Sequence, residues 1–291
     1  MSVAESSGGS RSGGPRLASS KMCFQQAHNW IASASAITVL TGAGVSAESG
    51  IPTFRGQSGL WKQFRPEDLA TPEAFARDPK LVWEWYDWRR GLIEPAQPNP
   101  GHFALVRLQK RAPRFTLITQ NVDGLHQAAG SHSVLEVHGS IWKLRCTECD
   151  RSWFDRTVPL NIPPGCECGG LVRPGVVWFG ENLPHDVWAT AQNAARTCAV
   201  FLVIGTSAVV YPAAGLMHLA KSCGAKVVEI NTEPTPVFSI RGFGGAPPSR
   251  KSTVNSIYIE VSSAFPVNSP APWTAWPSPT KRRAPGTWTG K

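Results

Sequence analysis

Short apolar runs alternate with longer amphipathic stretches over most of the chain. Continuous runs rich in β-branched residues are typical of strands buried on both faces of a sheet. Such runs lie at 36–40, 115–119, 200–204 and 226–230. Stretches that favour helices lie between or before them, at about 25–35, 66–97, 99–110 and 187–197. This alternation predicts an α/β fold with a doubly wound parallel sheet.

A glycine-rich turn follows the first apolar run. Gly42, Gly44 and Ala47 have the Gly-x-Gly-x-x-Ala spacing of a dinucleotide-binding turn, whose glycines let the backbone approach a pyrophosphate. We expect a helix after this turn to direct its first amides at the anion. The acidic residue that usually holds a ribose about 20 positions later is absent. Phe54 and Arg55 follow the turn instead, and a turn without a ligand is the alternative interpretation.

Polar side chains gather where two further runs end. Gln120, Asn121 and Asp123 follow the second run, and His138 ends a short strand after it. Open α/β sheets carry their chemistry at the carboxyl ends of the strands, where crowded polar groups cost stability unless a ligand uses them. A histidine in that position is suited to general-base catalysis. The alternatives are an ordinary polar turn and a structural histidine.

A tryptophan-rich helical stretch after the glycine turn contains another candidate pair. Tyr86 and Arg89 are three residues apart, so on a helix their side chains share a face. One interpretation places Tyr86 in an aromatic core and Arg89 in solvent. The other directs both side chains at a carboxylate, whose geometry a guanidinium matches. The spacing is compatible with both.

Four of the seven cysteines fall in two close pairs. Cys146 and Cys149 form a Cys-x₂-Cys pair, and after sixteen residues Cys166 and Cys168 form a Cys-x-Cys pair. Four thiolates at this spacing predict a structural zinc site of the ribbon type, with no open coordination position. The second pair is one residue shorter than usual, which predicts strained ligand geometry. The other cysteines are scattered, which fits a reducing compartment better than a disulfide framework.

The net charge of +9 is concentrated at the two ends of the chain. Seven Lys and Arg against two Glu lie in 232–291, and three against one lie in 1–36. The charge therefore does not indicate specific nucleic-acid binding. Turns interrupt the uncharged segment 199–217, so we expect no membrane span. We expect a cytoplasmic protein, or a mitochondrial-matrix protein in a eukaryote, with a monomer as the default oligomeric state.

The segment from Gly42 to Gly56 resembles the NAD-binding motif of the sirtuins, the NAD-dependent protein-lysine deacylases. The resemblance continues in order over residues 36–238. It implies a catalytic core at 25–238. The Ser- and Gly-rich start of the chain predicts a disordered segment at 1–24. The implied Rossmann-like large domain comprises 25–56, 98–144 and 171–238, and the small domain comprises the helical insertion 57–97 and the zinc ribbon 145–170.

The resemblance implies NAD as co-substrate and one structural zinc ion. Gln120 and Asn121 would hold the nicotinamide ribose, and Asp123 the nicotinamide amide. The full set of implied NAD-binding residues is Gly42, Ala43, Gly44, Phe54, Arg55, Trp61, Gln120, Asn121, Asp123, Gly205, Thr206, Ser207, Asn231, Thr232 and Glu233. The implied zinc ligands are Cys146, Cys149, Cys166 and Cys168.

Acyl-lysine proteins are the implied substrates. Their backbone would pair, as an added strand, with Val177, Trp178, Phe179 and Gly180. In the implied reaction the acyl oxygen attacks the nicotinamide ribose and nicotinamide leaves. His138 acts as general base on a ribose hydroxyl, and the products are free lysine and O-acyl-ADP-ribose. Tyr86 and Arg89 match the Tyr-x-x-Arg pair of class III sirtuins, which implies a preference for succinyl, malonyl and glutaryl groups and weak deacetylation.

The chain departs from the family pattern after about residue 238. A segment rich in glycine and proline replaces the usual glycine turn and closing helix. We expect 239–291 to be an atypical and largely disordered tail, with 253–261 as its one candidate strand. Loss of the usual ending predicts lower stability and weaker NAD binding.

Other functions compete with this interpretation. The glycine turn alone also fits an NAD(P) oxidoreductase, but the missing ribose acid is against it. The basic ends and four cysteines also fit a nucleic-acid-binding zinc ribbon, but the near-neutral centre is against that. Within the family, the alternatives are a deacetylase of broader specificity and a variant impaired by its C-terminal segment.

Overall fold

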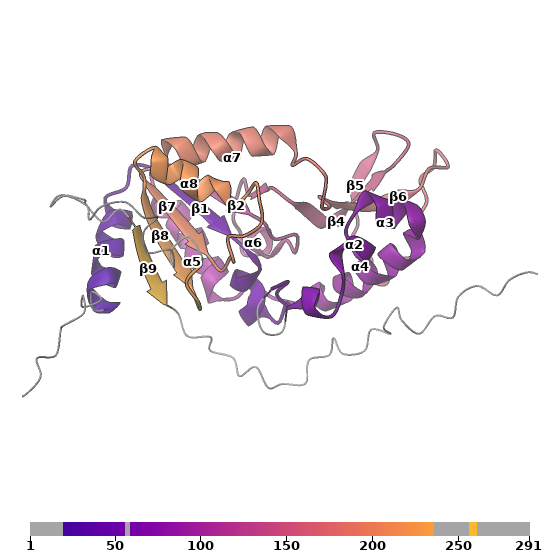
Figure 1. Cartoon of the computed structure of the whole chain (residues 1–291), viewed down its shortest axis with the longest axis horizontal. Coiled ribbons are helices and arrows are strands. Elements are labelled where there is room, and N and C mark those ends of the chain that lie inside the picture. Colours follow the sequence, from indigo (N-terminus) through magenta and orange to yellow (C-terminus); the bar gives the residue numbers. More distant parts are fainter. Residues whose placement is uncertain (1–19, 56–58, 236–255, 261–291) are drawn as a thin grey trace, which may run out of the picture.

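The computed structural model describes residues 20–55, 59–235 and 256–260 (Figure 1). Within these residues the main sheet has six strands, all parallel, in the order β3-β2-β1-β7-β8-β9. They are β1 Ile37–Thr41, β2 Phe115–Thr119, β3 Leu135–Glu136, β7 Val200–Ile204, β8 Lys226–Asn231 and β9 Ser256–Glu260. After β1 the chain adds β2 and β3 on one side of β1, and it later adds β7, β8 and β9 on the other side. The strand order therefore reverses between β1 and β7.

Helices cover both faces of this sheet (Figure 1). The helices around it are α1 Ser20–Ala32, α5 Pro100–Arg111, α6 Leu125–Ala128, α7 His185–Thr197 and α8 Gly215–Ser222. Side chains alternate along β7, so Val200 and Leu202 pack with α1 and α5 while Phe201 and Val203 pack with α7 and α8. Burial on both faces explains why the strands are continuous apolar runs.

A second, smaller core joins helices to a three-stranded antiparallel sheet in the order β5-β4-β6. Its elements are η2 Leu60–Lys62, α2 Pro66–Leu69, α3 Pro72–Arg77, α4 Pro79–Ile93, β4 Gly139–Cys146, β5 Ser152–Phe154 and β6 Val172–Val176. Trp83 of α4 and Trp142 of β4 are fully buried in it. Arg90, also fully buried, donates to the carbonyls of Ile141 and Asp155 at 3.2 and 2.6 Å. This arginine ties α4 to the small sheet.

The α/β fold predicted from the hydrophobic pattern is confirmed. The strands predicted at 115–119 and 200–204 have the observed bounds, and those predicted at 36–40 and 226–230 agree to within one residue at either end. In the part of the chain that the structure describes, no helix is both long and apolar enough to cross a bilayer.

The helix expected after the glycine turn is present, but it is a short 3₁₀ helix and not an α-helix. Residues Ala43–Ser49 form a 3₁₀ helix, η1, in which each bond spans three residues, as from the Val45 N–H to the Gly42 carbonyl at 3.1 Å. Gly50 ends it in the left-handed conformation at φ 83°, and Pro52 lies just beyond. Only seven residues lie between Gly42 and Gly50, and Pro52 follows, so too little chain is left for a longer helix.

The last strand of the sheet comes from the predicted C-terminal tail. β9 lies within the strand predicted at 253–261 and pairs in parallel with β8, with Ile257 opposite Val228. Ile257 and Ile259 are buried in the core that also holds Ala27 of α1. The tail predicted over 239–291 otherwise lies outside the described residues. β9 therefore covers the edge of β8 and adds apolar contacts to α1.

Replacing Ile257 with alanine is expected to lower the free energy of unfolding by about 2–5 kcal/mol, because it removes buried methyl groups and leaves a cavity. Chemical denaturation measures the change. Glu260→Ala, on the exposed last residue of the same strand, is the matched control and should stay within about 0.5 kcal/mol of the parent. An Ile257→Ala variant as stable as this control would show that β9 adds nothing to the core.

Candidate active site

Two glycine turns meet where the strand order reverses. The Gly44 N–H donates to the Gly205 carbonyl at 2.7 Å, which joins the turn after β1 to the turn after β7. A β-carbon on Gly44 would lie 2.7 Å from that oxygen, and one on Gly42 would lie 2.6 Å from the Thr206 side chain. Side chains would therefore separate the two turns. Open α/β sheets bind their ligands at such a reversal.

Polar side chains at several strand ends cross-link these turns. Gln120, after β2, donates to the Thr206 hydroxyl at 2.9 Å, and Asn231, at the end of β8, donates to the Thr206 carbonyl at 2.9 Å. The fully buried Glu229 accepts from the N–H and the hydroxyl of Thr235, at 2.9 and 3.0 Å. Burial raises the pKa of Glu229. Exposed beside this network are Ser207, Thr232 and Glu233.

Ser46 organises a second polar group at the same edge. Its hydroxyl donates to the Asp123 carboxylate at 2.8 Å and accepts from the Asn121 side-chain amide at 3.1 Å. All three residues are buried. The structure therefore brings Asn121 and Asp123 together through a residue that was not among the sequence candidates. Nothing in the pattern distinguishes Ser46 from Ser49 in the same turn.

Two buried histidines lie next to Ser46. His102 Nδ1 accepts from the Asn99 N–H at 3.2 Å, so the neutral ring carries its hydrogen on Nε2, 3.5 Å from the Ser46 hydroxyl. The His126 ring lies 4.9 Å from that of His102, centre to centre. Burial lowers the pKa of His102 and lowers the pKa of His126 to about 3. Both rings are therefore neutral at pH 7.

His138 is half-buried, two residues after β3. Its Nδ1 lies 3.2 Å from the Gln120 carbonyl oxygen. A carbonyl only accepts, so Nδ1 carries the hydrogen and Nε2 is the unprotonated nitrogen. Burial lowers the pKa of His138, which keeps the ring neutral at pH 7. No described residue bonds Nε2, so this nitrogen is available as a base.

The segment 177–180 bridges the two cores next to His138. The Val177 N–H donates to the His138 carbonyl, and the Phe179 N–H donates to the Ala70 carbonyl at the end of α2, both at 2.9 Å. Trp178 is buried between these bonds, whereas Phe179 and Gly180 are exposed. The segment therefore lies at the candidate base.

Tyr86 and Arg89 of α4 are both buried, with 3% and 6% of their surface exposed. The interpretation that places Arg89 in solvent is therefore wrong. Its guanidinium carbon lies 4.7 Å from the Phe54 ring centre and 5.0 Å from that of Trp85. Among the described residues it makes no hydrogen bond, and the Asp123 carboxylate acts on it only as a nearby charge. Burial lowers the pKa of Arg89 and raises the pKa of Tyr86 to about 12.

Aromatic side chains from separate segments surround this arginine. The Trp61 ring lies 5.2 Å from Phe54, 5.7 Å from Trp85 and 6.1 Å from Phe179, centre to centre. Arg55 is exposed next to Phe54. The cluster joins the loop after the glycine turn, helix α4 and the segment 177–180 at one place. Two of its members, Phe54 and Trp61, were sequence candidates for cofactor contact.

The four paired cysteines converge between β4 and β6. Their sulfur atoms all lie within 4.8 Å of one another. Cys146 and Cys168 are 3.5 Å apart, and Cys149 and Cys166 are 3.8 Å apart, sulfur to sulfur. Tetrahedral zinc with bonds of about 2.3 Å places its sulfur ligands about 3.8 Å apart, so this set fits zinc. The short Cys-x-Cys pair therefore does not prevent convergence.

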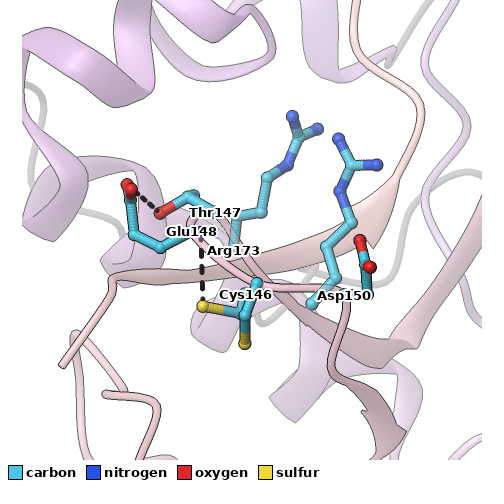
Figure 2. A pocket seen from close by; sticks show the side chains of 7 residues that line it. Cys146, Thr147, Glu148, Asp150 and Arg173 are labelled. Carbon is cyan, nitrogen blue, oxygen red and sulfur yellow. Dashed lines mark hydrogen bonds between the residues drawn. The ribbon is translucent and has the colours of Figure 1, made fainter. Parts of the chain in front are cut away.

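Polar side chains line a pocket next to these cysteines (Figure 2). On one side the Glu148 N–H donates to the Cys146 sulfur at 3.3 Å. Backbone donors of this kind stabilise thiolate ligands. On the other side Arg145 and Arg173 share the carboxylate of Glu181, at 3.4 and 2.6 Å. The zinc loop is thus connected to the segment that carries Trp178.

Comparison with known proteins finds relatives of this chain. The model of the Sir2 family matches residues 42–212. The NAD-dependent protein deacylase of Aquifex aeolicus is 62% identical over 206 residues, which cover 70% of this chain and 86% of the relative. NAD-dependent protein deacylase 2 of Pyrobaculum aerophilum is 55% identical over 211 residues, covering 72% and 85%.

Solved structures agree as well. A Sir2 homologue in complex with NAD is 46% identical, with a TM-score of 0.72, and the match covers 81% of this chain and 88% of that one. A complex of Sir2 with a p53 peptide and NAD⁺ is 32% identical, with a TM-score of 0.67 and coverage of 75% and 90%.

Replacing Cys166 with serine is expected to remove the bound zinc and lower the thermal midpoint, because the ion holds together the loops of the small sheet. Elemental analysis of the purified protein measures the metal directly. Cys223→Ser, at an exposed cysteine at the end of α8, is the matched control and should keep its zinc. A full zinc complement in Cys166→Ser would mean that other ligands hold the ion.

Proposed function

The chain belongs to the Sir2 family, and we propose that it removes succinyl, malonyl and glutaryl groups from the lysine side chains of proteins. It is an NAD-dependent protein-lysine deacylase, with NAD as co-substrate and one structural zinc ion at the four cysteines. The observation that carries the acidic preference is Arg89, a buried guanidinium that has no acceptor among the described residues and lies on the same helix face as Tyr86.

The free energy of burying Arg89 favours an acidic ligand. A buried cation without a hydrogen-bond acceptor is costly, and the faces of Phe54 and Trp85 and the charge of Asp123 offset only part of that cost. A carboxylate at the end of an acyl chain would accept two parallel hydrogen bonds from the guanidinium. An acetyl group ends in a methyl and would leave the charge unpaired. The site is thus better matched to dicarboxylic acyl groups.

We assign NAD to the edge where the two glycine turns meet. Gln120 and Asn121 would hold the nicotinamide ribose and Asp123 the nicotinamide amide, next to the Ser46 group. The adenosine ribose would lie against the second glycine turn and the end of β8. Side chains of Thr206 and Asn231, already fixed by hydrogen bonds, would order that region before NAD binds. The complex of a relative with NAD supports this assignment.

His138 would act as the general base. Nε2 is the nitrogen without a hydrogen, so it can take a proton from a ribose hydroxyl, and the Gln120 carbonyl stabilises the imidazolium that results through Nδ1–H. The substrate backbone would add to the segment 177–180 and thereby bring its acyl-lysine to the same place. Aromatic rings around Phe54 and Trp61 would exclude water while nicotinamide leaves.

Arg89→Met removes the charge but retains an apolar side chain. We expect kcat/KM for a succinyl-lysine peptide to fall roughly 10- to 150-fold, which corresponds to a loss of about 1.5–3 kcal/mol of transition-state stabilisation. The kcat/KM for an acetyl-lysine peptide should fall less. Mass spectrometry of both peptides, with and without NAD, measures this. Arg77→Met, at an exposed arginine of α3, is the matched control and should change neither rate. Equal loss of both activities would favour a deacylase of broader specificity.

His138→Ala is expected to lower kcat about 10²–10⁴-fold while the protein stays folded and retains its zinc. In the parent enzyme the lowered pKa of His138 keeps the base unprotonated down to more acidic pH. The acidic limb of the kcat/KM profile should therefore lie below pH 6.5. A variant with near-normal turnover would exclude His138 from the reaction, and circular dichroism controls for folding.

A further inference from the structure

Trp178 fixes the orientation of the Tyr86 hydroxyl group. Its Nε1–H donates to the Tyr86 oxygen at 2.9 Å, and both side chains are buried. An indole N–H can only donate, whereas a phenol has one hydrogen and two lone pairs. The Tyr86 oxygen is therefore the acceptor in this bond, and its own hydrogen must point away from Trp178.

The described residues offer that hydrogen no acceptor. The raised pKa of Tyr86, about 12, keeps the hydroxyl protonated at neutral pH. Arg89, one turn further along α4, also has only donors. This part of the site therefore has unused donors from two side chains, and no other described residue accepts the Tyr86 hydrogen.

Trp178 is itself held rigidly. The guanidinium of Arg173 lies 3.3 Å from the centre of its ring, and the Phe75 ring lies 5.3 Å away. Glu181 accepts the Trp178 backbone N–H at 2.8 Å and binds Arg173 through both carboxylate oxygens, at 2.6 and 2.9 Å. The indole cannot rotate without disrupting these contacts, so its N–H has one direction.

We infer that Trp178 is a positioning residue for acyl specificity: its indole N–H occupies one lone pair of Tyr86 and so directs the Tyr86 hydrogen at the acyl carboxylate. This inference rests on the acidic-acyl preference proposed above. Trp178 acts through Tyr86 and does not reach the reacting atoms. A phenylalanine in its place would leave the hydroxyl free to rotate, so part of its donor capacity would be lost.

Trp178→Phe retains an aromatic ring and removes the N–H. We expect kcat/KM for succinyl-lysine relative to acetyl-lysine peptide to fall about five- to tenfold, mainly through a higher KM for the succinylated peptide. Trp83→Phe is the matched control. It also removes a buried indole hydrogen bond, from Trp83 to the Val172 carbonyl at 2.6 Å, but Trp83 does not bond the Tyr86 hydroxyl. The ratio should be unchanged in that control.

A double-mutant cycle with Tyr86→Phe separates positioning from packing. Once the Tyr86 hydroxyl is gone, Trp178→Phe should leave the ratio unchanged. The inference is overturned if the ratio falls equally in both backgrounds, or if the single Trp178→Phe variant keeps the parental ratio.

The hydrogen bond can also be tested without substrate. In ¹⁵N-labelled parent protein, the assigned Trp178 indole signal should shift when Tyr86 is replaced by phenylalanine, and an unchanged signal would overturn the inference even if Trp178→Phe did not fold. A parent enzyme without preference for succinyl over acetyl peptides would overturn the proposed function, and with it the specificity role. The indole shift would still report the bond in that case.

Discussion

The close contact between the two glycine turns is the constraint on which the site depends. Because Gly44 donates to the Gly205 carbonyl, β1 and β7 end side by side, and every polar group at this edge is placed relative to that contact. The amides of Gly42, Gly44 and Val45 are all used within the protein. The glycines thus serve to bring two chain segments together, and this role differs from the anion-binding amides that a dinucleotide turn predicts.

Three arginines of the smaller core are buried, and their different surroundings explain their different roles. Arg90 donates to main-chain carbonyls and pairs with Asp155, and Arg173 pairs with Glu181. Both stabilise the core, because their charges are compensated within it. Arg89 differs because only aromatic faces contact it. Because Arg89 makes no hydrogen bond with the described residues, its guanidinium can bind an anion from outside.

Most of the fold follows from the hydrophobic pattern, whereas the finer parts of the site do not. Apolar runs identify the parallel strands because a strand that is buried on both faces of the sheet needs apolar side chains at nearly every position. The 3₁₀ form of the helix after β1 was not predicted, since its length depends on Gly50 and on a contact with a turn over 150 residues away in the chain. Ser46 and the Trp178–Tyr86 bond depend on tertiary contacts between distant segments, which periodicity does not encode. The cysteine spacing, by contrast, was sufficient because metal ligands occur at characteristic separations.

The contact between α1 and β9 has a consequence for how the chain is made. These elements lie near opposite ends of the sequence and share one core. During synthesis α1 leaves the ribosome more than 200 residues before the strand that completes its packing. Contacts between distant segments form slowly, because the intervening chain must first be ordered. A chain that has not yet reached β9 would present the bare edge of β8 to neighbouring nascent chains, and such an edge can pair with another strand.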